Sequence, residues 1–237
     1  ISEESEQLPY EKRRDFDYCW IVDPLDGTKE FLRRTGDFAV MIGLSLRGAP
    51  VLGVVHAPAL ESPKTYYAVT GKGAFVLSGA ACGTGLGGSE PISVRSFSAT
   101  DAGLKLAVSS TRPPETFIAA CDNPKTFSIG SAALKALAVA TGEADVFPCF
   151  YITSEWDTCA THAIIEEAGG AVLRYDGVGD GGMADIASAL QHEKRAATAE
   201  SARQCDRSSG FGGDLRLCYN KPSLSSPQCL FIGRCTF

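Results

Sequence analysis

The pattern of hydrophobic and polar positions predicts short strands in the first part of the chain and alternating helices and strands afterwards. Residues 18–22 are apolar, aromatic or β-branched, which predicts a buried strand. A proline and a glycine then stop the run and leave Asp23 and Asp26 at its carboxyl end, where open α/β sheets place their chemistry. Residues 28–33 can begin a helix directly after these acids.

Runs rich in β-branched and aromatic residues dominate the sequence up to about residue 100. Residues 38–46 and 51–56 are joined by a turn sequence with glycine and proline, which predicts a hairpin. Runs at 65–69 and 74–77 extend the hairpin into a meander. Residues 83–88 match Gly-x-Gly-x-x-Gly, but no helical sequence follows, so we expect a loop and no dinucleotide site.

Helical and strand patterns alternate after about residue 104. A strand over 105–110 precedes a helical stretch that ends near residue 121. The next helix begins after Ser131, whose hydroxyl suits an N-cap, and stops at Gly142. Its expected core-facing stripe consists of Leu134, Leu137 and Ala138.

A further helix is predicted from apolar residues that recur at helical spacing between residues 156 and 164. Gly169-Gly170 ends this helix, which puts Asp157 near its N-terminus, an ordinary position for a capping acid. Residues 176–214 shift toward glycine, alanine, serine and charge, and we expect a surface insertion there.

Composition and charge narrow the possible functions. The 237 residues are 44% hydrophobic and 21% charged, as in a globular protein, and no apolar run is long enough to span a membrane. A net charge of −6 provides no basic stripe for a nucleic acid polymer, so any bound phosphate is expected to belong to a small substrate. Nine cysteines without a Cys-x-x-Cys pair favour a reducing compartment, and we expect an intracellular, soluble protein. The oligomeric state is left open.

The two acids after the first strand are candidates for metal binding. Asp23 and Asp26 flank a proline, so their carboxylates can point into one small volume, where either a proton or a cation must relieve their repulsion. Mg²⁺ suits this position because it takes oxygen ligands, including a backbone carbonyl such as that of Leu25. The first amides of the following helix would favour a phosphate. The alternative is a capped turn in which Asp26 binds backbone amides.

Three motifs, read together, point to a known family. They are the acid pair Glu3-Glu4, then Asp-Pro-Leu-Asp-Gly-Thr at 23–28, and Trp-Asp at 156–157. In this order they resemble the magnesium-dependent, lithium-sensitive phosphatase superfamily of inositol monophosphatase and fructose bisphosphatase. The resemblance implies a mixed α and β fold, an alternating α-β-α-β-α layered sandwich. We expect an amino-terminal metal- and phosphate-binding half at 1–103 that lacks the family's front helices, and a carboxy-terminal α/β half at 104–237.

Within this superfamily, Lys29-Glu30-Phe31 and residues 154–158 look like the corresponding sequences of 3′(2′),5′-bisphosphate nucleotidases. The aromatic stretch at 147–151 suits a nucleobase better than a sugar hydroxyl, although residues 148–153 lack the Arg and Gly-Pro that these nucleotidases often carry. The resemblance implies removal of the 3′-phosphate from adenosine 3′,5′-bisphosphate to give AMP. The alternatives are an inositol or sugar monophosphatase of the same superfamily and a non-catalytic remnant that binds metal or phosphate.

The resemblance also implies roles for individual residues. Two or three Mg²⁺ ions would be held by Glu3, Asp23, the Leu25 carbonyl, Asp26 and Asp157. Asp23 would bridge two of these ions, and Glu3 and the Thr28 hydroxyl would orient the attacking water. The expected substrate contacts are Gly27, Thr28, Gly130, Ser131 and Ala132.

Overall fold

The computed structural model describes residues 1–79, 88–98, 100–109, 111–174, 217, 219, 221, 223–226 and 228–236. The insertion predicted at 176–214 lies outside the described residues, as does all of the predicted loop at 83–88 except Gly88. None of the helices in the described part of the chain is long and apolar enough to cross a bilayer.

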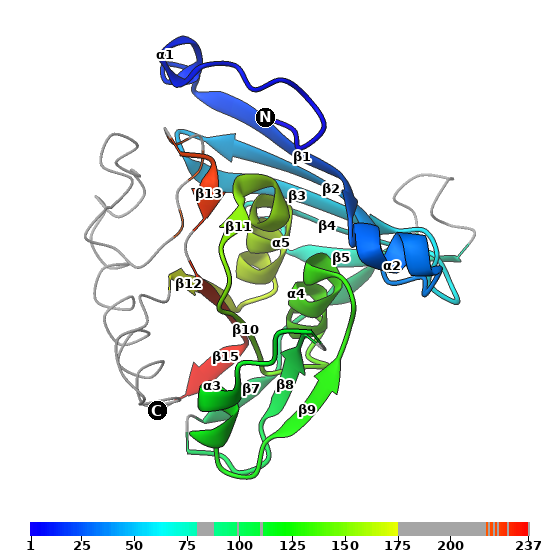
Figure 1. Ribbon diagram of the computed structural model, residues 1–237. Coiled ribbons are helices and arrows are strands. Elements are labelled where there is room, and N and C mark those ends of the chain that lie inside the picture. Colours follow the sequence, from blue (N-terminus) through cyan, green and yellow to red (C-terminus); the bar gives the residue numbers. More distant parts are fainter. Residues whose placement is uncertain are drawn as a thin grey trace.

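A six-stranded antiparallel sheet, in which the strands follow one another in chain order, forms the amino-terminal part of the fold (Figure 1). Its strands are β1 (Tyr18–Asp26), β2 (Ala39–Leu46), β3 (Ala49–Ala57), β4 (Lys64–Val69), β5 (Ala74–Ser78) and β6 (Glu90–Ile92). The predicted hairpin and meander are confirmed. At the hairpin turn, Arg47 and Gly48 have φ values of 50° and 87°, as the two central residues of a type I′ turn require.

Two short helices flank the first strand. The predicted helix after the acids is confirmed as α2 (Thr28–Arg33). The polar segment before β1 contains a single helical turn, α1 (Tyr10–Arg13), which the sequence pattern did not predict. Arg13 is buried there because its guanidinium donates hydrogen bonds to the carbonyls of Leu8 (3.1 Å) and Lys221 (2.7 Å). These bonds fasten the amino-terminal segment to the carboxy-terminal part of the chain.

A second sheet has the strand order β12-β14-β10-β8-β9. Its strands are β8 (Lys105–Val108), β9 (Lys125–Ser128), β10 (Val146–Cys149), β12 (Ala171–Arg174) and β14 (Cys229–Ile232). Strand β8 runs parallel to both of its neighbours, whereas β14 is antiparallel to β10 and β12. Two minor pairs complete the strands: β7 (Ser96–Ser98) with β15 (Arg234–Thr236), and β11 (Thr153–Ser154) with β13 (Ser225–Ser226).

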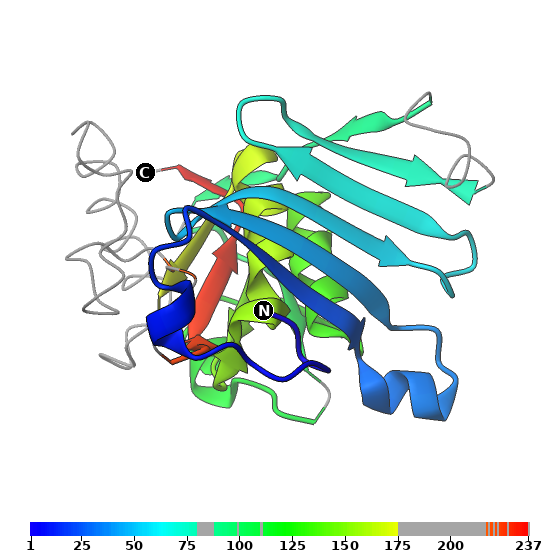
Figure 2. The same ribbon diagram turned by 90° about the horizontal axis from the view of Figure 1, so that it is seen from above.

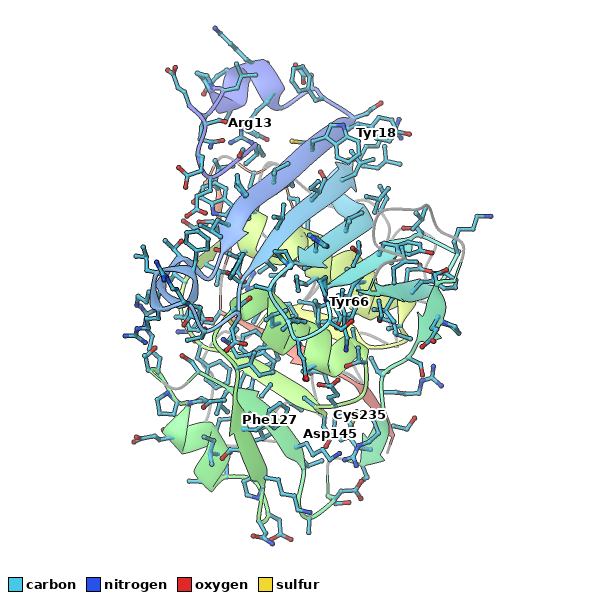
Figure 3. All side chains as sticks on the ribbon, turned by 90° about the vertical axis from the view of Figure 1, so that its right-hand side faces the viewer. Arg13, Tyr18, Tyr66, Phe127, Asp145 and Cys235 are labelled. Atoms are coloured by element: carbon cyan, nitrogen blue, oxygen red, sulfur yellow. The ribbon has the colours of Figure 1, made fainter. Side chains whose placement is uncertain are left out.

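The helices α4 (Ala132–Ala140) and α5 (Glu155–Glu167) lie between the two sheets, and α3 (Glu115–Ala119) packs beyond the second sheet (Figure 1). The expected mixed α and β fold with alternating layers is confirmed. The stripe predicted for α4 is too narrow, because every residue from 133 to 140 is buried where both sheets cover the helix. Figure 3 labels Tyr66 on the first-sheet side of these helices and Asp145 on the second-sheet side.

The outer face of the first sheet carries apolar and aromatic side chains. Tyr18 and Trp20 are 62% and 55% exposed, and Ile42 is 37% exposed. Their strand neighbours Cys19 and Ile21 point to the inner face and are buried. None of the described helices covers the outer face of this sheet (Figure 2).

Candidate active site

Strand β1 carries two of the acids into the interior. The strand extends to Asp26, beyond the predicted end at residue 22, and its register against β2 shifts between Asp23 and Asp26. Residues three apart on a regular strand point to opposite faces, so this irregularity allows both acids to be buried on one side. Asp23 is 1% and Asp26 is 8% exposed.

Asp157 comes from the first turn of α5, as predicted. Ser154 precedes the helix, and its backbone amide donates to Oδ2 of Asp157 at 2.5 Å. One carboxylate oxygen each from Asp23, Asp26 and Asp157 lies within 4.8 Å of the other two. The structure therefore brings Asp157 of α5 close to two acids of β1 that are far from it in sequence.

The ionisation of these acids is strongly perturbed. Burial, reinforced by the charges of Asp26, Glu3 and Asp157, raises the pKa of Asp23 to about 8. Burial also raises the pKa of Asp157 to about 6, and it raises the pKa of Asp26. The three groups cannot all be ionised at neutral pH unless a cation balances them. Because all their donor atoms are hard oxygens, the residues fit Mg²⁺.

Asp26 is held by the beginning of α4. Its Oδ2 accepts a hydrogen bond from the Ser131 hydroxyl and another from the Ala133 amide at 2.9 Å. The alternative of a capped turn is thus partly realised, since Asp26 does bind a backbone amide, but that amide belongs to a distant helix. Among the described residues, no hydrogen bond reaches the other oxygen, Oδ1, which leaves one oxygen for a metal ion.

The residues that follow Asp26 form the start of α2. Gly27 has a φ of 87°, and a Cβ built there would meet the Asp37 carbonyl at 2.8 Å. The exposed Thr28 donates its hydroxyl to the Leu25 carbonyl at 3.3 Å, and the Leu25 amide donates to Oδ1 of Asp23 at 2.8 Å. The Leu25 carbonyl and the Thr28 hydroxyl, both predicted to belong to the site, therefore lie beside the acids in the turn that joins β1 to α2.

Glu3 is attached to the strand that carries Asp23. The Glu3 amide donates to the Val22 carbonyl at 3.2 Å, and the Val22 amide donates to the Ile1 carbonyl at 2.9 Å. The sequence gives no sign of this pairing, which fixes the Glu3 backbone against β1. The carboxylate is exposed, yet it contributes to raising the pKa of both Asp23 and Asp157.

The three residues expected to face the substrate lie at the start of α4. Gly130 and Ala132 are half-buried, whereas Ser131 is 1% exposed and its hydroxyl is used by Asp26 and by the Leu134 amide (3.1 Å). The predicted N-cap is therefore confirmed. A Cβ at Gly130 would lie only 2.2 Å from Cγ of Glu30. The absence of a side chain at Gly130 therefore allows the beginnings of α2 and α4 to lie close together.

The aromatic residues expected to contact a nucleobase differ in how far the fold buries them. Phe147 is buried and stacks on Phe231 with ring centroids 5.1 Å apart, so it cannot contact a ligand. Phe150 packs edge-on against Phe117, and Tyr151 is half-buried beneath the Arg112 guanidinium, 5.3 Å from its ring centroid. The expectation holds at most for residues 150 and 151.

Comparison with known proteins identifies the family. The model described as the inositol monophosphatase family matches residues 1–207. The chain belongs to the inositol monophosphatase family. The resemblance inferred from the acid motifs is therefore confirmed.

Relatives within the inositol monophosphatase family carry a common name. A Salmonella typhimurium protein named 3′(2′),5′-bisphosphate nucleotidase CysQ is 39% identical over 181 residues, covering 75% of this chain and 67% of that protein. The protein of the same name from Aggregatibacter actinomycetemcomitans is 35% identical over 176 residues, with coverage of 73% and 62%. The chain thus spans about two thirds of the length of these curated relatives.

Solved structures of the inositol monophosphatase family match the fold. CysQ from Bacteroides thetaiotaomicron has a TM-score of 0.70 at 32% identity, covering 97% of this chain and 74% of that chain. Staphylococcal IMPase-II has a TM-score of 0.57 at 25% identity, covering 73% and 62%. The greater similarity to CysQ agrees with the sequence resemblance.

Proposed function

We propose that the protein is a magnesium-dependent phosphomonoesterase that removes the 3′-phosphate from adenosine 3′,5′-bisphosphate to give AMP and phosphate. The observation that carries the proposal is the buried cluster of Asp23, Asp26 and Asp157 beside the first turns of α2 and α4. The names of the CysQ relatives support the choice of substrate.

The proposed metal ligands are Glu3, Asp23, the Leu25 carbonyl, Asp26 and Asp157. Two or three bound Mg²⁺ ions would supply charge neutralisation for the phosphate and a lower pKa for a coordinated water. Without them, the acids would repel an anionic substrate. Once the ions balance the negative charge of the acids, the same acids define a small polar volume in which a phosphate can be held.

The remaining groups bind the phosphate and direct the water. The backbone amides of Gly27 and Thr28 donate to phosphate oxygens at the start of α2. Glu3 and the Thr28 hydroxyl orient the water oxygen toward phosphorus, opposite the bond to the 3′-oxygen. As the new P–O bond forms, the bond to the 3′-oxygen breaks, and this oxygen leaves as the hydroxyl of AMP after it takes up a proton.

The nucleoside would lie between the start of α4 and two half-buried aromatic residues, Phe150 and Tyr151. Gly130 and Ala132 flank one side, and Phe150 and Tyr151 offer ring surface to a base. An inositol ring would gain little from these aromatic rings, which favours the nucleotide over the inositol alternative.

A substrate panel tests the proposal. Phosphate release is measured with Mg²⁺ for adenosine 3′,5′-bisphosphate and for inositol 1-phosphate, and the two kcat/KM values are compared. We expect the nucleotide to be preferred, and Asp23→Asn to abolish release from it. A preference for inositol 1-phosphate would favour an inositol phosphatase. No release from either substrate by a folded protein would favour the non-catalytic alternative.

A further inference from the structure

We propose that Lys135 is a positioning residue for the proposed metal site, because its ammonium group fixes the segment of chain that grips Asp26. Lys135 lies on α4 and is only 1% exposed. Its Nζ donates to three consecutive carbonyls, those of Ile129 (3.1 Å), Gly130 (2.9 Å) and Ser131 (2.9 Å). The inference rests on the proposed function and deepens it.

A buried ammonium group destabilises a folded protein unless other interactions offset its loss of hydration. Removing a charge from water is unfavourable, and here burial lowers the pKa of Lys135 while the nearby Asp26 opposes that change. The three carbonyls use all three N–H donors of the ammonium. Phe147 lies beneath it, with Nζ 5.4 Å from the ring centroid. An apolar residue would fill this place in the core at lower cost, so the ammonium itself has a use.

Ser131 connects the ammonium to the acid cluster. Its carbonyl accepts from Lys135, while its hydroxyl donates to Asp26. The Ala133 amide adds a second bond to the same carboxylate oxygen. Lys135 thus acts on Asp26 through the loop, and no hydrogen bond joins the two side chains directly among the described residues. Loss of the ammonium would release the loop and let Asp26 change its orientation.

The same three bonds orient backbone amides. In a trans peptide, the C=O and the following N–H point in opposite directions, and the described residues contain no cis peptide bond. Because the carbonyls of residues 129–131 point to Lys135, the amides of Gly130, Ser131 and Ala132 point away from it. None of these amides donates to another described residue. Lys135 therefore holds both Asp26 and the groups proposed to face the substrate.

Direct metal binding provides the test. Free Mn²⁺ is measured by electron paramagnetic resonance as it is titrated into the substrate-free protein, alongside the melting temperature without metal. Lys135→Met keeps the apolar stem and removes the ammonium, and we expect its Mn²⁺ dissociation constant to rise about tenfold. Lys135→Arg keeps the charge and is expected to stay within about threefold of the wild type. Leu137→Ala, a buried change two residues further along the same helix, serves as the control for loss of stability.

The control separates positioning from a merely structural role. Leu137→Ala should lower the melting temperature and leave Mn²⁺ affinity unchanged. Equal Mn²⁺ affinity in Lys135→Met and the wild type would overturn the inference, and so would an equal loss of affinity in Leu137→Ala. Lys135→Gln, which keeps two N–H donors without the charge, replaces the Met variant in these comparisons if that variant does not fold.

The readout also distinguishes this inference from the proposed reaction. Wild-type protein that binds Mn²⁺ but releases no phosphate would contradict the proposed reaction and leave the role of Lys135 intact. Wild-type protein that binds no Mn²⁺ would refute both. In active protein, we expect Lys135→Met to need about tenfold more Mg²⁺ for half-maximal activity and to show a raised KM for the nucleotide.

Discussion

Substitution of Gly53 by alanine is expected to move α5 and, with it, Asp157. Gly43 and Gly53 are paired across β2 and β3, and both lie against this helix. A Cβ at Gly53 would stand 2.1 Å from the carbonyl oxygen of Ala160, and a Cβ at Gly43 would stand 2.6 Å from the sulfur of Cys159. The contact at Gly53 is with helix backbone, so no rotation of a side chain can relieve it.

The displacement follows from these distances. Real Cβ atoms essentially never approach closer than 3.0 Å, so helix and strand must separate by about 0.9 Å at this point. Overpacking of this kind costs about 1–3 kcal/mol of unfolding free energy. Asp157 lies less than one helical turn from Ala160 and would be carried with it. A misplacement of about 1 Å near reacting groups can lower the rate about a hundredfold.

The assay combines urea denaturation with phosphate release at fixed Mg²⁺. Gly53→Ala should lower the unfolding free energy by about 1–3 kcal/mol and kcat/KM by about a hundredfold. Val54→Ala, on the same strand but facing away from α5, is the matched control and should lose about 1 kcal/mol with little change in kcat/KM. Wild-type turnover in a destabilised Gly53→Ala protein would refute the idea that α5 fixes the position of Asp157.

Three further predictions concern Asp23, the buried Asp145 and Ser131 at the start of α4. Because the pKa of Asp23 is raised to about 8, the metal-free folded protein keeps a proton that the unfolded chain has lost, so this group makes stability fall between about pH 4 and 8. Mg²⁺ should therefore raise the melting temperature more at pH 8 than at pH 5, and equal shifts would contradict the coupling. Asp145→Ala breaks a two-point ion pair between the fully buried Asp145 and the half-exposed Arg95 (2.6 and 2.5 Å), and it should cost about 2–4 kcal/mol in urea denaturation. Ser131→Ala removes both an N-cap and a bond to Asp26; it should cost about 1–2 kcal/mol and raise the Mg²⁺ concentration for half-maximal activity, whereas a change in stability alone would show that Asp26 does not need this bond.

The first sheet could be predicted because its strands are runs rich in β-branched and aromatic residues and the connection between β2 and β3 carries turn residues. The end of β1 could not, because Pro24 normally marks the end of a strand. In the structure β1 is the edge strand of the sheet, where a missing backbone donor is tolerated, and its irregularity accommodates the proline. The error concerned only a few residues, but those residues include both acids.

The helix α4 shows a different limit of sequence reasoning. A stripe was expected because periodicity identifies one apolar face, yet a helix enclosed by two sheets is apolar all round. Lys135 is the exception within that run, and its place among eight alanine, leucine and valine residues was the available signal that it has a buried partner. That signal could have identified a special lysine, but not the three carbonyls that it binds, since these depend on how the loop before the helix turns.

The candidate site depends as much on glycines as on acids. The motifs identified Asp23, Asp26 and Asp157, but their convergence requires close backbone approaches that a sequence does not display. Gly27 lets the β1–α2 turn contact the Asp37 carbonyl, and Gly53 lets α5 settle on the first sheet. A side chain at either position would displace an element that carries at least one of these acids. The geometry of the cluster thus depends on residues with no metal-binding chemistry, so a search for acids finds the candidate ligands but not their arrangement.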